Sequence, residues 1–187
     1  MAIEHFRVIT FLVYLASWLA VAVGAVMGAI PGRKQRTGAG AGISPAVAAG
    51  TLLQVVAVLP ITMALGDAPL RPGMGGMLAA LALAPFGAAM YWWALRSAPS
   101  GSEGDQLVTG GAYRVLRHPM YLGFLALVMA TGLLATATLR LGVAIALYLA
   151  GTELRVAAEE AELAERFPGE YAEYQRATRW RYLWGLR

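Results

Sequence analysis

Apolar residues run in long blocks along most of this chain, separated by short polar stretches. Four blocks are about 20 residues long or longer, at residues 8–30, 45–66, 74–95 and 119–138. About 20 consecutive apolar residues in a helix cross the roughly 30 Å hydrocarbon core of a bilayer. Two blocks open with Pro45 and Pro119, and proline is common in the first turn of a helix. The pattern therefore predicts four membrane-spanning helices.

A fifth apolar block is shorter, and charged residues follow it directly. Residues 141–152 carry no charge, but Glu153, Arg155 and Glu159 come next. If this block also crosses, as a span at about 140–158, these charges lie near membrane depth, where charged side chains usually face a cavity or the bundle interior. The alternative is an early exit, with the charges at the interface. We expect a fifth span and then a charged helical tail, which Pro168 and Gly169 break in two.

Composition supports a membrane protein. Hydrophobic residues make up 58% of the chain and charged residues 14%, whereas soluble domains have about 45–50% and about 25%. The absence of cysteine excludes disulfides and thiolate metal sites. We predict an all-α integral membrane protein, with residues 1–187 forming a single membrane domain of five transmembrane helices plus a cytoplasmic C-terminal helical tail.

The distribution of cations predicts the orientation. The segment at 32–36, the 96–118 loop and the C-terminal tail together hold 12 of the 15 Lys and Arg residues. The other side has only Arg7, Arg71 and Arg140. Because cytoplasmic loops carry an excess of Lys and Arg, we expect an outside N-terminus and a cytoplasmic C-terminus, in the plasma (inner) membrane of a prokaryote. The cations form no basic patch typical of nucleic-acid binding.

Polar side chains of types that bind ligands or take part in catalysis gather in the predicted cytoplasmic regions. Arg155 and Glu159 are four residues apart, so their side chains share one helix face, a spacing that an ordinary surface ion pair also has. The chain has two histidines, too few for a metal cage, and lacks the motifs of acyl transfer and nucleotide-triphosphate binding. An arginine for a carboxylate and a glutamate for an ammonium suit a zwitterionic ligand. The gathered residues are Tyr113, Arg114, Arg117, His118, Tyr121, Arg155, Glu159 and Glu160.

The last part of the tail contains two segments rich in aromatic residues. Leu163, Phe167, Tyr171 and Tyr174 could form a stripe across the Pro-Gly break, and such stripes are more often packing than a cofactor site. Residues 179–187 mix cations with Trp and Tyr, a composition that is typical of an interfacial anchor. We expect no catalytic residue in this final segment.

Two motifs resemble a known family. The sequence LVTGGAYRVLRHPMYLG, followed by RVAAEEAELAERFPGEYAEY, resembles the isoprenylcysteine carboxyl methyltransferase family. Related membrane methyltransferases that act on phospholipid amines and small thiols carry similar tails. The resemblance covers about residues 96–179, and its specific element is Arg-His-Pro-x-Tyr-x-Gly at 117–123. It is weaker at Ala112, where many relatives have proline, and this departure concerns the acceptor more than the cofactor.

The resemblance implies a methyl donor, S-adenosylmethionine, and roles for particular residues. Arg155 would bind the methyl acceptor, and Arg155 and Glu159 would be the catalytic pair. Glu159 and Glu160 would also hold the cofactor, and no metal is implied. The other implied cofactor-binding residues are Gln106, Leu107, Val108, Tyr113, His118, Pro119, Met120 and Tyr121.

The resemblance leaves the acceptor open. A prenylcysteine-like carboxylate, a phospholipid amine or a small thiol are all lipophilic or membrane-accessible acceptors that would enter from the bilayer. One alternative function is an NADPH-dependent membrane reductase of the sterol-reductase type, which has a similar His-Pro-x-Tyr element. Another is a non-enzymatic membrane protein, which would not need an ionised Arg155–Glu159 pair beside a cytosolic pocket.

Overall fold

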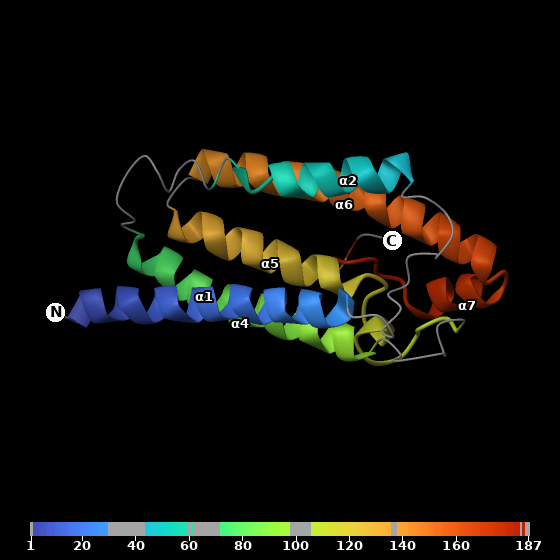
Figure 1. Ribbon diagram of the computed structural model, residues 1–187, viewed down its shortest axis with the longest axis horizontal. Helices are drawn as coiled ribbons and strands as arrows, with labels where there is room; N and C mark the ends of the chain where they lie inside the picture. Colours follow the sequence, from blue (N-terminus) through green and yellow to red (C-terminus); the bar gives the residue numbers. More distant parts are fainter. Residues whose placement is uncertain are drawn as a thin grey trace.

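The computed structural model describes residues 2–29, 44–59, 61, 72–97, 106–135, 138–183 and 185. Within these ranges all regular secondary structure is helical, which confirms the all-α prediction (Figure 1). The elements are α1 (Ala2–Ala29), α2 (Pro45–Val56), α4 (Met74–Ser97), the short 3-10 helix η1 (Gly111–Arg114), α5 (Pro119–Leu134), α6 (Thr138–Arg166) and α7 (Glu170–Ala177).

Three helices are long and apolar enough to cross a membrane: Ile3–Met27 in α1, Met74–Ser97 as α4, and Leu139–Arg166 in α6. The apolar helices α2 and α5 have 12 and 16 residues. At about 1.5 Å per residue, α5 is about 24 Å long. The arrangement of five spans therefore stays a prediction, and residues 60 and 62–66 of the expected second span lie outside the described residues.

One predicted helix boundary was wrong. The helix expected to run over 119–138 ends at Leu134, with Ala135 as its C-cap, and Thr138 already belongs to α6. The small and apolar residues around this junction continue the hydrophobic pattern, so periodicity could not locate it. The fifth span, expected at 140–158, is part of one continuous helix that extends to Arg166. The charged start of the tail is therefore an extension of the apolar helix.

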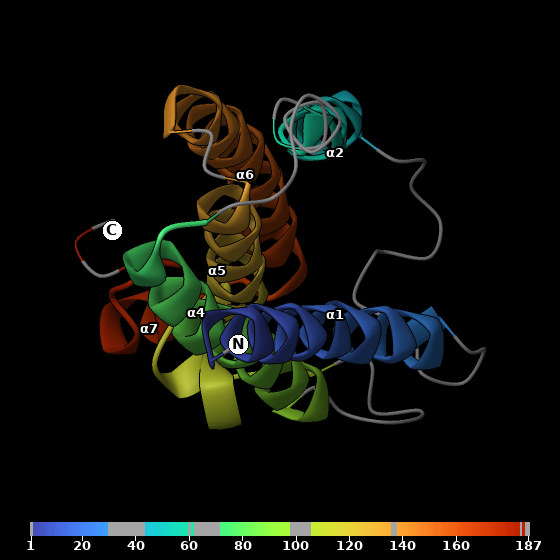
Figure 2. The ribbon, with the colours of Figure 1, turned by 90° about the vertical axis from the view of Figure 1, so that its left-hand side faces the viewer.

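Close backbone contacts hold α5 at the centre of the bundle. Figure 2 shows α5 between α4 and α1 on one side and α6 and α2 on the other. A Cβ atom on Gly87 of α4 would lie 2.6 Å from the carbonyl oxygen of Gly123 in α5, so only glycine permits this approach. By contrast, α1 leaves Leu19 and Val26 65% and 68% exposed. An apolar outer surface of this kind suits contact with lipid.

The predicted break in the tail is confirmed. Helix α6 ends at Arg166, Gly169 has a φ of 88°, and α7 begins at Glu170. The left-handed φ favours glycine at this position. The chain can therefore turn sharply and bring α7 back beside the segment at 106–114 (Figure 1).

The aromatic stripe across this break is packing, as expected. Tyr171 and Tyr174 are buried against Val108 and Tyr113 of the 106–114 segment, with Leu163 and Phe167 alongside. The Tyr174 hydroxyl also donates a hydrogen bond to the Tyr113 carbonyl oxygen over 2.7 Å. These contacts place the predicted cofactor loop at the same end of the bundle as the charged half of α6.

Candidate active site

The start of α5 brings the loop, the helix and the chain's last segment together. Pro119 occupies the first turn, and His118 is the N-cap residue with an extended φ of −132°. The backbone N–H groups of Arg117 and His118 donate to the carbonyl oxygens of Trp180 and Arg181, over 2.9 and 2.8 Å. Residues 178–183 therefore form a strap, which is hydrogen-bonded across the N-terminus of α5.

Glu160 is enclosed by two arginines and a histidine. Its Oε1 atom accepts from Arg117 Nε at 2.9 Å and lies 3.3 Å from His118 Nε2, and its Oε2 atom accepts from Arg181 Nη2 at 3.1 Å. Glu160 and Arg117 are 8% and 7% exposed. Arg117 Nη1 also donates to the carbonyl oxygens of Thr178 and Arg179. This buried network ties α6, the loop and the strap together.

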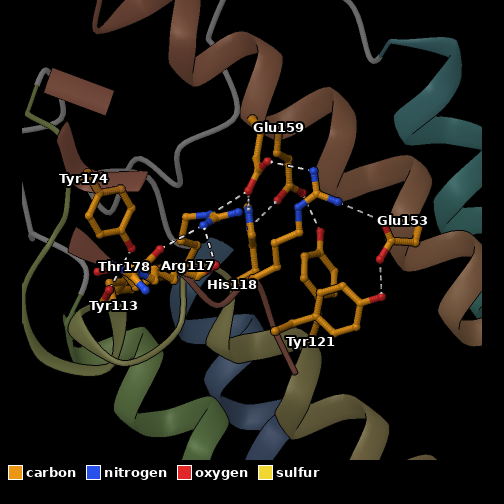
Figure 3. A network of polar contacts seen from close by, with 12 residues as sticks. Tyr113, Arg117, His118, Tyr121, Glu153, Glu159, Tyr174 and Thr178 are labelled. Atoms are coloured by element: carbon orange, nitrogen blue, oxygen red, sulfur yellow. Dashed lines mark hydrogen bonds and ion pairs between the residues drawn. The ribbon is translucent and has the colours of Figure 1, made fainter. Parts of the chain in front are cut away.

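Glu159, the neighbouring carboxylate, is more accessible. Its Oε1 atom accepts from the Tyr121 hydroxyl at 2.5 Å and from Arg155 Nη2 at 3.4 Å. Its Oε2 atom lies 3.4 Å from His118 Nδ1, and its side chain is 31% exposed, against 10% for Glu160. Figure 3 shows His118 between the loop and α6, beside Glu159. The imidazole therefore bridges two consecutive glutamates, one enclosed and one partly open.

The carboxylates determine the protonation of His118. Burial alone would lower the pKa of the imidazole, because it disfavours the charged form. Hydrogen bonds to Glu159 and Glu160 and the negative charges of both act in the opposite direction and outweigh burial. The pKa of His118 therefore lies above its ordinary value, and the ring is charged over a wider pH range than a free histidine.

Arg155 is held on three sides and keeps one donor without a partner. Its Nη1 atom donates to Gln54 Oε1 on α2 at 3.0 Å, and its guanidinium lies over the Tyr121 ring, 5.2 Å from the centroid. The pairing with Glu159 at 3.4 Å confirms the expected contact between residues four apart. Nε of Arg155 is buried without a hydrogen-bond partner in the described part of the chain. The guanidinium of a side chain that is 28% exposed can bind an anionic group.

The strap adds residues that the sequence analysis missed. Arg181 Nη1 donates to Glu153 at 3.1 Å, and the Tyr182 hydroxyl donates to the other oxygen of Glu153 at 2.5 Å. Tyr182 is 1% exposed, and its ring packs edge-on against Tyr121, with 6.4 Å between the centroids. Burial and the bond to Glu153 raise the pKa of Tyr182, so its hydroxyl stays protonated and donates. Arg181 and Tyr182 therefore belong to the polar network, which the interpretation of residues 179–187 as an interfacial anchor did not include.

The predicted site residues of the loop lie in the 106–114 segment, beside α7. Leu107 lines a cavity of about 580 Å³ between the 106–114 segment and α7. Val108 and Tyr113 are buried beneath it in the aromatic cluster, and Gln106 is exposed. This volume lies within the roughly 300–1,000 Å³ of small-molecule sites. The cavity lining is Leu107, Thr109, Arg114, Glu170, Glu173, Tyr174, Ala177 and Thr178.

The cavity and the charged cluster share a wall. Thr178 lines the cavity, and its carbonyl oxygen accepts from Arg117 in the cluster at 2.8 Å (Figure 3). Pro119 is fully buried, and Met120 packs against the apolar cores. The structure thus brings His118, Tyr121, Arg155, Glu159 and Glu160 into one cluster, with Leu107 facing the adjacent cavity. The cofactor roles of all these residues stay predictions.

A comparison with protein families gives one match. The model of the phospholipid methyltransferase family matches residues 81–170. The matched segment contains every predicted site residue, from Gln106 to Glu160, but neither Gln54 nor the strap. It confirms the relationship to the membrane methyltransferases that the motifs indicated. A search of curated proteins found no match.

Proposed function

We propose that this chain, whose residues 81–170 match the model of the phospholipid methyltransferase family, is a membrane enzyme that methylates a lipophilic acceptor with S-adenosylmethionine. The observation that carries the proposal is the polar cluster of His118, Glu159 and Arg155 at the end of an apolar helix bundle, inside the matched segment. A water-soluble donor and a membrane-embedded acceptor can meet only where a bundle opens to water.

The residues present fit a zwitterionic cofactor. The partly exposed carboxylate of Glu159 suits its ammonium group, and Glu160 is less suited because Arg117, His118 and Arg181 already enclose it. The neighbouring cavity, with Leu107 and Tyr174 in its wall, has room for a nucleoside. When bound, S-adenosylmethionine supplies an electrophilic methyl group on a sulfonium. The protein's task is then to align the acceptor and exclude water, since direct displacement needs little acid–base chemistry.

We assign the acceptor side to Arg155. Its side chain is 28% exposed, although its Nε atom is buried. It would bind the phosphate of a phospholipid amine or the carboxylate of a prenylcysteine, and the family match favours the phospholipid. An amine must lose its proton before its lone pair can take the methyl group. Because Glu159 is assigned to the ammonium group of the cofactor, this proton would leave to the water at the open end of the bundle.

Ligand binding tests the cofactor assignment. We expect purified protein in lipid nanodiscs to bind S-adenosylhomocysteine, and not NADPH, in calorimetric titrations. Glu159→Gln should weaken this binding by about ten- to a hundredfold, because a charge-assisted hydrogen bond contributes about 1.5–3 kcal/mol. Glu165→Gln, exposed on the same helix, is the matched control. Heat with NADPH alone would favour the reductase, and heat with neither ligand would contradict both enzymes.

Turnover tests the acceptor assignment. We expect transfer of labelled methyl groups to phosphatidylethanolamine in mixed micelles, with a prenylcysteine analogue as the second acceptor. Arg155→Ala should leave the affinity for S-adenosylhomocysteine nearly intact and lower turnover sharply, because the acceptor loses its alignment. Normal turnover by Arg155→Ala would mean that Arg155 and Glu159 form only a structural ion pair.

A further inference from the structure

Helix α2 contributes one side chain to the polar network, although it lies outside the family match. Gln54 Nε2 donates to Thr152 Oγ1 of α6 at 2.8 Å, and Gln54 Oε1 accepts from Arg155 Nη1 at 3.0 Å. The other polar residue within α2, Thr51, bonds only to its own helix, at the Val47 carbonyl oxygen. Gln54 is therefore the polar link between α2 and the charged half of α6.

The orientation of the Gln54 amide follows from its neighbours. The Thr152 hydroxyl donates to the Tyr148 carbonyl oxygen at 2.8 Å, and a carbonyl oxygen can only accept. Thr152 Oγ1 must then accept from the other side, so the NH₂ group of Gln54 points at it. The amide oxygen of Gln54 is thereby turned toward Arg155. A flipped amide would place two donors against each other at Arg155.

Glycines bring the two helices close enough for this contact. A Cβ atom on Gly50 would lie 2.5 Å from the Gly151 carbonyl oxygen and 2.6 Å from Arg155 Cγ. Gln54 follows Gly50 by four residues, so both lie on the face of α2 that packs on α6. The stem of Arg155 thus passes directly over Gly50, and the head reaches Gln54 one turn later.

We propose that Gln54 is a positioning residue, which orients Arg155 toward the anionic group of the lipid acceptor. The inference rests on the proposed function. Gln54 is neutral, so it fixes the direction of the guanidinium without neutralising it. Glu159 alone could not do this, because its contact with Arg155 is long, at 3.4 Å, and Tyr121 and His118 share its oxygens.

The test separates effects on acceptor binding from effects on cofactor binding. We expect Gln54→Leu to raise KM for phosphatidylethanolamine in mixed micelles by about tenfold, the effect of one hydrogen bond to a charged group. The affinity for S-adenosylhomocysteine should stay within about twofold, because no cofactor contact is lost. Thr152→Val, which keeps Gln54 but removes its anchor, should shift KM in the same direction by less. Thr51→Ala, on the same helix, should match the wild type.

A double-mutant cycle distinguishes positioning from a general effect on α2. If Gln54 acts through Arg155, Gln54→Leu adds nothing to KM in an Arg155→Lys background where that contact is already broken. Additive effects, or a Gln54→Leu variant that matches an active wild type, would overturn the role of Gln54 alone. A wild type that binds S-adenosylhomocysteine but methylates neither lipid would overturn the proposed function and this role with it.

Discussion

At the scale of single residues, two neighbouring glutamates have different surroundings. Glu159 and Glu160 follow one another on α6, yet Glu160 is enclosed by Arg117, His118 and Arg181, while Glu159 is partly open. Consecutive residues on a helix point about 100° apart, so one faces the strap and the other faces the side of Arg155. Glu160 therefore holds the structure together, and Glu159 is open enough to meet a ligand.

The enclosure of Glu160 predicts that neutralising this residue destabilises the protein. Glu160→Gln should lower the free energy of unfolding by about 3 kcal/mol, because removing one partner leaves buried cations uncompensated. Glu165→Gln, exposed on the same helix, should change it by less than about 0.5 kcal/mol. Denaturant unfolding in detergent measures both. Equal stability of the two variants would show that the Glu160 network contributes little.

His118 predicts a pH dependence of stability. Its pKa in the folded protein lies above the ordinary value, which is about 6.5 in an unfolded chain. The stabilisation is therefore fully present below about pH 6.5 and is lost as the pH rises through the folded pKa. We expect the melting temperature of the wild type, relative to His118→Gln, to fall over this range. A constant difference between the two proteins would contradict the coupling of His118 to the glutamates.

At the scale of elements, glycine decides how closely the helices approach. Gly50 and Gly151 bring α2 against α6, and Gly87 and Gly123 do the same for α4 and α5. No hydrophobic force drives apolar helices together within lipid, so close backbone packing and polar contacts must hold them. The position of Arg155 thus depends on a contact between glycines one turn away.

Substituting these glycines tests the dependence. Gly50→Ala should lower stability by about 2 kcal/mol, a typical cost of overpacking, because its Cβ meets the Gly151 carbonyl oxygen and Arg155. It should also raise the acceptor KM, since Arg155 must move. Gly142→Ala on α6 has open space around its Cβ and should be neutral or stabilising by up to about 1 kcal/mol. If Gly50→Ala behaved like Gly142→Ala, the close approach would carry no function.

At the scale of the whole molecule, the structure separates an apolar bundle from a polar end. Helices α1, α4 and α6 are long enough to span a membrane, and the charged half of α6, the loop, α7 and the strap gather at one end (Figure 1). The distribution of 12 of 15 cations predicts that this end is cytoplasmic. S-adenosylmethionine is made in the cytoplasm, so the proposed function requires the same orientation.

Cysteine labelling tests this orientation, and the chain contains no cysteine of its own. Single cysteines at Arg36 and Glu165 should react with a membrane-impermeant maleimide only after the membrane is opened. A cysteine at Arg71 should react in intact cells. Labelling of Glu165→Cys in intact cells would place the candidate site outside and contradict the proposed use of a cytosolic donor.

By itself, the sequence determined the local features. Apolar blocks predicted the helices, Pro119 marked the start of α5, Gly169 marked the break before α7, and the four-residue spacing joined Arg155 to Glu159. Each of these follows from periodicity or backbone preference within one or two turns, which a linear pattern contains. The end of α5 was missed because small and apolar residues continue across it.

Only the tertiary structure decided which distant residues meet. Gln54 lies 101 residues before Arg155, and Arg117 lies 43 residues before Glu160. Gln54 was an unusual polar residue in an apolar block, yet nothing local could name its partner. Arg181 and Tyr182 lie in a composition that also suits a membrane anchor, and only the strap's backbone bonds bring them to Glu153 and Glu160. Contacts of this range depend on helix packing, because local preferences leave the relative placement of helices open.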